Sequence, residues 1–154
     1  MFQSLLVVCL GNICRSPVAA AMLRAQFPQH MITSAGLNAL VGEPAHPMSA
    51  KLARADGLDI DAHQARQISP GMIHQAELIL VMDAGQRLAV GELQQSALGK
   101  TMLLGQWLTE NPNIADPCGQ SQDYFRLIHE KLELATQAWT EHLAAKPIKD
   151  KVLL

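Results

Sequence analysis

The sequence predicts an α/β fold: a single domain with a four-stranded parallel sheet and helices on both faces. Apolar runs of strand length alternate with helical stretches along the chain, and this alternation is typical of parallel sheets with right-handed crossovers. The clearest runs are apolar throughout, as strands buried on both faces are. Because ligands in such sheets bind beyond the carboxyl ends of the strands, we expect the functional site at that edge.

The first half of the chain contains two predicted strands and two predicted helices. Leu5 to Val8 is a continuous apolar run of β-favouring residues and predicts a buried strand. After a short polar loop, Ser16 is placed to cap and Pro17 to begin a helix made of strong helix formers. Residues 30–36 predict a short second strand, and residues 47–57 predict a helix that begins at a proline and ends at a glycine.

The second half repeats this alternation and ends in a long helix. Residues 77–82 predict the clearest later strand, residues 83–95 a helix, and residues 100–104 a fourth strand. The last helix is predicted to start near Ser121, because apolar residues then recur at steps of three and four. They form the stripe Phe125, Ile128, Leu132, Ala135, Trp139 and Leu143. Residues 146–154 have no such stripe, so we expect a loosely held tail there.

Length and composition indicate one globular domain over residues 1–154. A chain of this length buries a sufficient core by itself, and 49% apolar with 17% charged residues is ordinary for a folded protein. The net charge of −2 and the scattered Lys and Arg argue against nucleic acid as a partner. The apolar N-terminal run is too short for membrane insertion. Three cysteines, an odd number, favour a reducing compartment. We expect a cytoplasmic monomer or weak dimer.

The loop after the first strand, "CLGNICRSP", has the residue types of an anion site. A loop that leads into a helix N-terminus directs several backbone N–H groups to one point, where the helix dipole also favours negative charge. Gly11 and Asn12 readily accept the left-handed backbone conformations that such a loop requires. The predicted phosphate-binding residues are Leu10, Gly11, Asn12, Ile13, Cys14 and Arg15.

Three side chains of this loop carry the predicted chemistry. Arg15 offers a planar fork that can hold two phosphate oxygens. Helix N-termini and cationic neighbours favour the thiolate form of cysteine, so Cys9 is a candidate nucleophile aimed at the bound anion. Ser16 can donate to the thiolate when sulfur becomes the leaving group. The alternative, that Cys9 and Cys14 are small core residues and Arg15 a surface charge, is less favoured in this context.

A second loop, "ADPCG", offers a carboxylate for acid and base chemistry. Phosphoryl transfer needs an acid for the leaving oxygen and then a base for water. Asp116 is the candidate, because Pro117 favours an extended backbone before it, on a loop at the same sheet edge as Cys9. By the residues alone, a simple Asp-Pro turn is an equally good interpretation. A zinc site at Cys9 and Cys14 is not favoured, because the loop lacks further Cys or His ligands.

Taken together, these residues resemble the low-molecular-weight protein tyrosine phosphatases. The likeness is strongest to the bacterial branch that acts beside tyrosine autokinases in capsule and exopolysaccharide export. Besides the loop, the chain has "SAG" at 34–36, "HQARQI" at 63–68, "ELILVMD" at 77–83 and "ADP" at 115–117, in the family's order. "LNALVGEPA" after the first of these also resembles the bacterial branch. The resemblance therefore covers nearly the whole chain.

The resemblance implies a reaction through a phosphocysteine that needs no metal and no other cofactor. It implies Cys9 as nucleophile, Arg15 as phosphate clamp, Ser16 as leaving-group stabiliser and Asp116 as general acid and then base. The implied substrate is phosphotyrosine in a protein, and the implied partner is a bacterial tyrosine autokinase.

The resemblance also assigns supporting roles. Asn12, Ser34 and His63 match residues that hold the family's loop through hydrogen bonds. Cys14 matches the family's second loop cysteine, which can form a reversible disulfide with the nucleophile Cys9 and so protect it from further oxidation.

One position departs from the family's pattern. Where the family has Asp-Pro-Tyr, this chain has Cys118 after Pro117, so the aromatic wall that would stack on the phosphotyrosine ring is missing. We expect Leu37, Leu40 and Cys118 to form the substrate wall instead, since Tyr124 lies too far along the last helix. Weaker selection for aryl phosphates is the predicted consequence.

Three other functions remain open from the sequence. Arsenate reduction uses the same kind of loop with additional cysteines; residues 82–100, where these are expected, contain none, although Cys118 could serve. Arginine-phosphate hydrolysis is less favoured, because related enzymes carry Thr where this chain has Ile13. A phosphotyrosine-binding or redox-sensing module with little turnover is disfavoured by the joint presence of Cys9 and Asp116.

Overall fold

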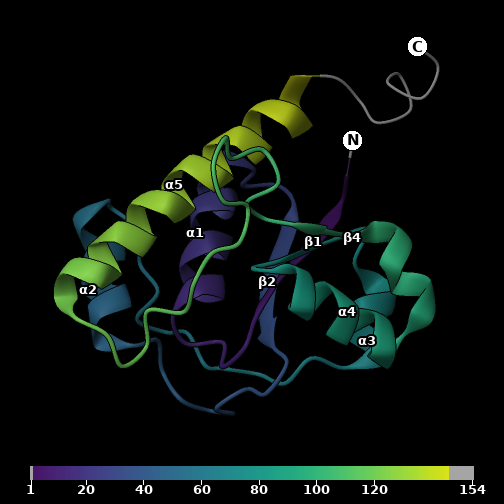
Figure 1. Ribbon diagram of the computed structural model, residues 1–154, viewed down its shortest axis with the longest axis horizontal. Helices are drawn as coiled ribbons and strands as arrows, with labels where there is room; N and C mark the ends of the chain where they lie inside the picture. The colour runs from purple at the N-terminus through teal and green to yellow at the C-terminus, as the bar shows by residue number, and fades with distance from the viewer. Residues whose placement is uncertain (1, 146–154) are drawn as a thin grey trace.

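The computed structural model describes residues 2–145, and the expected tail at residues 146–154 lies outside the described residues. Within that range, four parallel strands form one sheet in the order β2-β1-β3-β4 (Figure 1). The strands are β1 (Ser4–Cys9), β2 (Met31–Gly36), β3 (Leu78–Val81) and β4 (Thr101–Leu103). The predicted α/β class and the four-stranded parallel sheet are confirmed.

Helices cover both faces of the sheet, as predicted. On one face α1 (Arg15–Gln26), α2 (Pro47–Ala55) and α5 (Gln122–Ala145) pack against one another; α3 (Pro70–Gln75) and α4 (Ala84–Leu93) lie on the other (Figure 1). Side-chain alternation along β1 separates the two cores. Leu5 and Val7 belong to the core beneath α1 and α5, whereas Leu6 and Val8 belong to the core beneath α3 and α4.

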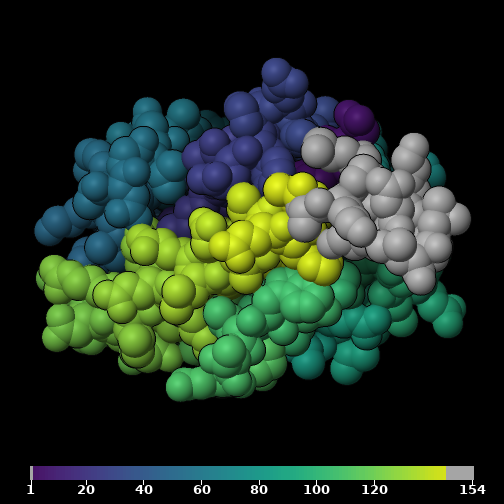
Figure 2. Space-filling view, turned by 90° about the horizontal axis from the view of Figure 1, so that it is seen from above, coloured from purple at the N-terminus to yellow at the C-terminus, as the bar shows by residue number. Residues whose placement is uncertain are grey.

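The long helix α5 closes the larger core. All six residues of its predicted stripe are buried, and each large apolar side chain buried in this way contributes roughly 1.5–3 kcal/mol. Figure 2 shows α5 along one face of the molecule, between α1 and α2 on one side and the segment of residues 104–115 on the other. No helix within residues 2–145 is both long and apolar enough to cross a membrane.

The helix elements differ from the sequence prediction at two points. The short α3 and the 3-10 helix η1 (Gln95–Lys100) were not predicted, because six residues are too few to show a helical period. In addition, α1 begins at Arg15 after an N-cap residue, Cys14, whose side chain makes no capping hydrogen bond. Ser16 is therefore not the helix cap. Its hydroxyl oxygen lies 2.9 Å from Cys9 Sγ instead.

The end of β2 lies directly against the loop that follows β1. Gly36 pairs with Cys9 across the two strands. A Cβ atom at Gly36 would lie 2.6 Å from the carbonyl oxygen of Leu10 and 3.0 Å from Cβ of Asn12. Only glycine permits this close approach, so the loop is packed tightly onto the sheet edge.

Candidate active site

Residues 9–15 connect β1 to α1 and line a pocket at the carboxyl edge of the sheet. The carbonyl oxygens of five consecutive residues, Cys9 to Ile13, each accept a hydrogen bond of 2.6–3.1 Å from residues 37–63 around the loop. The donors are the backbone N–H groups of Leu37, Asn38, Leu40 and His46 and the ring of His63. In a trans peptide the N–H points opposite to the C=O. The N–H groups of residues 10–14 therefore turn inward and form a cradle suited to phosphate.

Asn12 fixes the shape of this cradle. It is fully buried and adopts the left-handed conformation, with φ of 60°. Its side-chain Nδ2 donates to Ser16 Oγ at 2.7 Å and to Ser34 Oγ at 3.0 Å, and its Oδ1 accepts from the backbone N–H of Arg66 at 2.9 Å. Arg66 also donates from Nε to the carbonyl oxygen of Ser34 at 2.8 Å. Arg66 lies in the "HQARQI" segment but is not among the predicted loop-support residues, because its bond to Asn12 comes from the backbone N–H, which leaves no residue signature.

His63 supports the same residue from the other side. Its Nε2 lies 2.6 Å from the carbonyl oxygen of Asn12. A carbonyl can only accept, so Nε2 carries the proton and donates it. Burial lowers the pKa of His63, and the positive charges of Arg24 and Arg66 lower it further, against the opposing effect of the hydrogen bond to Asn12. The ring is therefore neutral at physiological pH.

Cys9 lines the pocket as a free, buried thiol. Its Sγ is 2.9 Å from Ser16 Oγ, and either atom could donate on distance alone. The network decides the direction: because Asn12 Nδ2 donates to Ser16 Oγ, the proton of Ser16 remains available for the sulfur. Ser16 is thus oriented to donate a hydrogen bond to a thiolate.

Arg15 links the cradle to the loop that carries Asp116. Its side chain is only 4% exposed. Nη1 donates to the carbonyl oxygen of Ile114 at 2.7 Å, and Nη2 lies 3.8 Å from Asp116 Oδ2. Its buried Nε has no hydrogen-bond partner among residues 2–145. A guanidinium N–H that is buried and unpaired is available to a ligand oxygen in the pocket.

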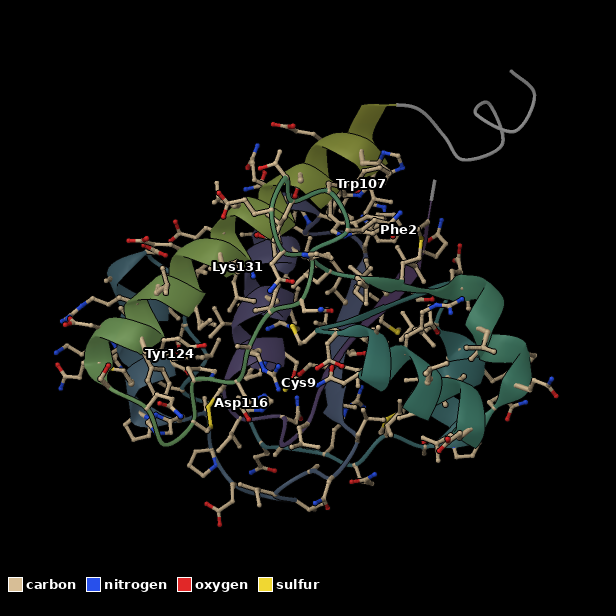
Figure 3. All side chains as sticks on the ribbon, in the orientation of Figure 1. Phe2, Cys9, Trp107, Asp116, Tyr124 and Lys131 are labelled. Carbon is tan, nitrogen blue, oxygen red and sulfur yellow. A yellow bond between two sulfur atoms is a disulfide. The ribbon has the colours of Figure 1, made fainter. Side chains whose placement is uncertain are left out.

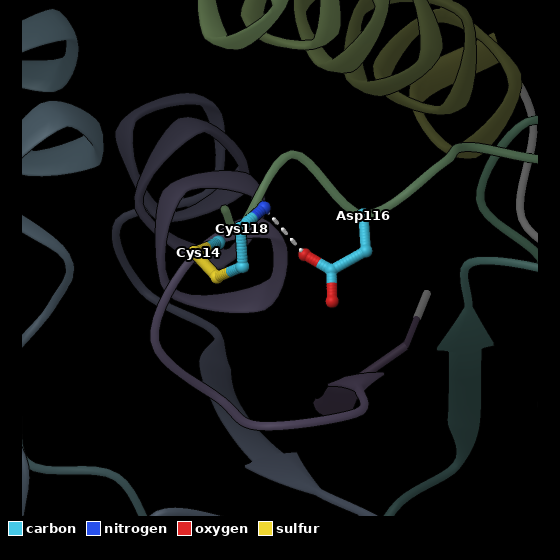
Figure 4. A group of neighbouring side chains, drawn as sticks. All are labelled: Cys14, Asp116 and Cys118. Atoms are coloured by element: carbon cyan, nitrogen blue, oxygen red, sulfur yellow. Dashed lines mark hydrogen bonds between the residues drawn. A yellow bond between two sulfur atoms is a disulfide. The ribbon is translucent and has the colours of Figure 1, made fainter. Parts of the chain in front are cut away.

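Asp116 lines the same pocket as Cys9, and Figure 3 shows their side chains on neighbouring segments. The Asp116 side chain is 40% exposed, so water and substrate can reach it. Its Oδ1 accepts from the backbone N–H of Cys118 at 3.0 Å (Figure 4). This bond is the Asp-Pro turn considered in the sequence analysis, and the turn holds the carboxylate at the pocket.

Cys14 is bonded to Cys118 by a disulfide, across a separation of 104 residues (Figure 4). The family resemblance implied that Cys14 can form a reversible disulfide with Cys9; in this structure Cys14 is bonded to Cys118 instead. Cys118 and Cys14 pack together against Phe125 of α5, whereas Cys9 Sγ lies beside Ser16 Oγ.

The walls of the pocket are partly those predicted. Leu40 and Cys118 line it, together with Leu10 and Ile13 of the cradle. Leu37 is not among the lining residues: it continues the face of Ala35 and packs, partly buried, against the core beneath α3 and α4. The next residue, Asn38, lines the pocket instead and was not predicted. Tyr124 packs against the core beneath α5, away from the residues that line the pocket.

Two groups of residues in the described part of the chain could offer ligand atoms to a metal. One is Cys14, Asp116 and Cys118, whose sulfur atoms are joined in the disulfide. The other lies where α2 meets α5, away from the pocket. There His129 Nε2 is 2.6 Å from Asp56 Oδ2 and 3.2 Å from Glu133 Oε1, and the contact with Asp56 links α5 to the C-terminal end of α2.

Comparison with known proteins identifies the family. Residues 4–149 match the model of the low molecular weight phosphotyrosine protein phosphatases. The chain is 40% identical to a probable low molecular weight protein-tyrosine-phosphatase, AmsI of Erwinia amylovora, over 94% of this chain and 99% of that protein. It is also 40% identical to the low molecular weight protein-tyrosine-phosphatase Wzb of Salmonella typhimurium, over 95% of this chain and 97% of that protein.

The fold of this chain is also similar to that of a solved structure. The structure of Vibrio vulnificus Wzb in complex with benzylphosphonate superposes with a TM-score of 0.89 at 37% identity, covering 93% of this chain and 100% of that one. The family match covers the cradle, the Asp116 loop and the segments between them. This chain therefore belongs to the low molecular weight phosphotyrosine protein phosphatase family.

Proposed function

We propose that the chain hydrolyses phosphotyrosine in protein substrates through a phosphocysteine intermediate. The observation that carries this proposal is the cradle itself. Five outward carbonyl groups turn the N–H groups of residues 10–14 toward Cys9. A phosphate held by these donors and by Arg15 has its phosphorus atom in front of the thiol, and fixed dipoles of this kind stabilise the charge that develops on its oxygens.

In the first step, Cys9 Sγ attacks phosphorus as the bond from phosphorus to the tyrosine oxygen breaks. The leaving oxygen needs a proton, and Asp116 is the carboxyl group at the pocket that can deliver it. The planar guanidinium of Arg15 donates hydrogen bonds to the oxygens of the phosphoryl group throughout the transfer. Its donors are the unpaired Nε and the Nη groups near the Asp116 loop. The product of this step is a phosphocysteine at Cys9.

In the second step, water attacks phosphorus and the sulfur–phosphorus bond breaks. Asp116, now a carboxylate, accepts the proton of the attacking water. The departing thiolate of Cys9 receives the hydrogen bond of Ser16, whose oxygen is oriented by Asn12. Inorganic phosphate then leaves the cradle, and the starting state is restored.

The walls of the pocket support an aromatic substrate. Leu10 and Leu40 at the rim are 47% and 51% exposed, and apolar groups with this exposure can cover the two faces of a phenyl ring. Ile13 adds a third apolar side chain. The tyrosine that the family places after Asp-Pro is replaced by Cys118, so we expect weaker contacts with the ring on that side.

The test measures phosphate release from a phosphotyrosine peptide and from matched phosphoserine and phosphoarginine peptides, under reducing conditions. We expect turnover of the phosphotyrosine peptide and a loss of at least about 10⁴-fold in kcat for Cys9→Ser. A rapid acid quench of the wild type should capture a phosphopeptide that contains Cys9. Full activity of Cys9→Ser, or preference for phosphoarginine, would contradict the proposal.

We further propose that the cellular substrates include an autophosphorylated bacterial tyrosine kinase in the cytoplasm. The support is the resemblance to the bacterial branch of the family. A Cys9→Ser protein retains the cradle but transfers no phosphate, so it should hold phosphotyrosine proteins from a lysate. Mass spectrometry of the retained proteins should identify a tyrosine kinase that is absent when vanadate, a competing oxyanion, is added.

A further inference from the structure

All three cysteines of the chain line the same pocket. Cys9 and Cys14 belong to the cradle, and Cys118 belongs to the Asp116 loop. Cys9 is a free thiol, whereas Cys14 is bonded to Cys118. Cys14 thus lies between two possible partners, the nucleophile within its own loop and the cysteine that approaches from the other loop.

The disulfide lies on the wall of the pocket rather than inside a core. Cys14 is only 4% exposed, but Cys118 is half-buried and lines the pocket beside Asp116. A small hydroperoxide or a dithiol reductant that enters the pocket can therefore reach these sulfur atoms. A disulfide that serves stability alone needs no such access.

We propose that Cys118 is the resolving thiol of a three-cysteine relay that returns Cys9 to its thiolate after oxidation by a hydroperoxide. The inference rests on the proposed role of Cys9 as the nucleophile. It assigns to Cys118 a task beyond the substrate wall, and it explains why the structure holds the Cys14–Cys118 bond while Cys9 stays free.

The relay has three balanced steps. The Cys9 thiolate attacks the terminal oxygen of the peroxide, whose O–O bond breaks; a sulfenic acid forms on Cys9, and the other oxygen takes up a proton from solvent and leaves as water, or as an alcohol from an organic hydroperoxide. The Cys14 thiol then attacks the Cys9 sulfur, the Cys9–Cys14 disulfide forms, and a second water leaves. Finally the Cys118 thiolate attacks the Cys14 sulfur, the Cys14–Cys118 bond forms, and the Cys9 thiolate is released with the electron pair of the broken bond. Cys118 returns one proton to solvent when it ionises for the third step. In sum, Cys14 and Cys118 supply the two electrons that reduce one peroxide.

The product of the relay, with Cys14 bonded to Cys118 and Cys9 free, retains the catalytic groups. Cys9 is again a thiol beside Ser16, and the new bond ties the Asp116 loop to the cradle. In that state the backbone N–H of Cys118 donates to Asp116 Oδ1, which keeps the carboxylate at the pocket. A dithiol reductant is then needed to restore Cys14 and Cys118 before the next oxidation.

The test starts from fully reduced protein, freed of reductant and mixed with one equivalent of hydrogen peroxide at neutral pH. Wild type, Cys118→Ser and Cys118→Ala are compared by disulfide mapping under non-reducing conditions. Activity toward a phosphotyrosine peptide is expressed relative to each protein's own reduced, untreated sample. We expect the wild type to form Cys14–Cys118 and to keep at least about tenfold more of its activity than either variant, both of which stop at Cys9–Cys14.

Reduced Cys9→Ser protein tests whether oxidation enters through Cys9. The relay predicts that this variant forms Cys14–Cys118 much more slowly than the wild type. An equal rate would overturn the relay, because Cys14 or Cys118 would then be oxidised directly. Equal loss of activity in the wild type and in Cys118→Ser, with Cys9–Cys14 as the lasting product, would also overturn it. The disulfide map gives its result even if the reduced protein shows no phosphatase activity, so the two proposals fail separately.

Discussion

The two loops that meet at the pocket are held in different ways. In residues 9–15 five consecutive carbonyl groups are bonded outward, and the side chain of Asn12 is bonded at both ends inside the protein. The loop of residues 114–118 is attached through the Ile114 carbonyl to Arg15 and through the disulfide to Cys14, and its carboxylate is exposed.

This difference follows from what each loop has to do. Donors that stabilise a developing charge must be fixed before the substrate arrives, and a buried network of hydrogen bonds fixes them. A carboxyl group that first gives and then takes a proton must instead meet a leaving group and then water, which requires access. Changes in the cradle should therefore slow the reaction more than changes in the Asp116 loop, and changes in the Asp116 loop should also alter selectivity.

Among substitutions that leave the nucleophile in place, the largest effect is expected where the two loops are joined. Arg15→Lys keeps the charge but loses the planar fork and the bond from Nη1 to Ile114. Two charge-assisted hydrogen bonds to the phosphoryl group are lost in the transition state, so we expect kcat/KM to fall about 10³-fold. The control is Arg126→Lys, at a half-exposed arginine of α5. A loss of less than tenfold would show that Arg15 acts only as a charge.

A smaller loss is expected from the acid. Asp116→Asn removes the proton donor and leaves the cradle intact, so kcat for a phosphotyrosine peptide should fall about 10²-fold to 10³-fold. The loss should be smaller for p-nitrophenyl phosphate, whose leaving group needs less protonation. Asp123→Asn, at an exposed carboxylate of α5, is the matched control. Equal losses for the two substrates would argue that Asp116 serves a structural purpose only.

The same two loops show what the sequence can and cannot predict. The cradle is one contiguous segment whose glycine, asparagine, arginine and cysteine each have a local reason to be there, and the stripe of α5 repeats a period over many residues. Both are therefore readable from the sequence. The contact between the loops depends on tertiary packing, so the bond from Cys14 to Cys118 was not foreseen.

Side-chain direction at the end of a strand is equally hard to read. Leu37 is apolar and near the loop, as a wall residue should be, but it continues the face of Ala35, while polar Asn38 lines the pocket. The hydrogen bond from Arg66 to Asn12 cannot be predicted from residue type either, because the donor is the backbone N–H of Arg66. Residue type carries the chemistry, whereas contacts made by the backbone or across loops require the fold.

Selectivity should respond to the residue after Asp-Pro. Cys118→Tyr restores a ring at this wall but also removes the disulfide, so the matched control is Cys118→Ser, which removes the disulfide alone. An added aromatic contact stabilises by about 0.5–1.5 kcal/mol, which corresponds to a gain of roughly twofold to tenfold in kcat/KM for aryl over alkyl phosphates. Measuring both substrates under reducing conditions separates the two effects. No gain of Cys118→Tyr over Cys118→Ser would place the substrate ring elsewhere.

The smallest expected effect concerns the pH dependence of the cradle's stability. Burial lowers the pKa of His63 in the folded protein, so the unfolded chain binds this proton first as the pH falls below about 6.5. Protonation of the unfolded state then lowers the free energy of unfolding, and this loss continues until the folded pKa is reached. At higher pH the histidine is neutral in both states and contributes no slope.

His63→Gln keeps an N–H donor for the Asn12 carbonyl but cannot take up a proton. We therefore expect its free energy of unfolding, measured in urea at pH 7.5, 6.5 and 5.5, to fall less steeply with acidification than that of the wild type. At pH 7.5 the substitution should cost no more than about 1 kcal/mol. His74→Gln, at an exposed histidine of α3 outside the cradle, is the matched control for loss of a histidine. If the free energy of unfolding of His63→Gln falls with acidification as steeply as that of the wild type, groups outside the cradle cause the loss of stability. The folded loop would then not depend on a neutral His63 ring.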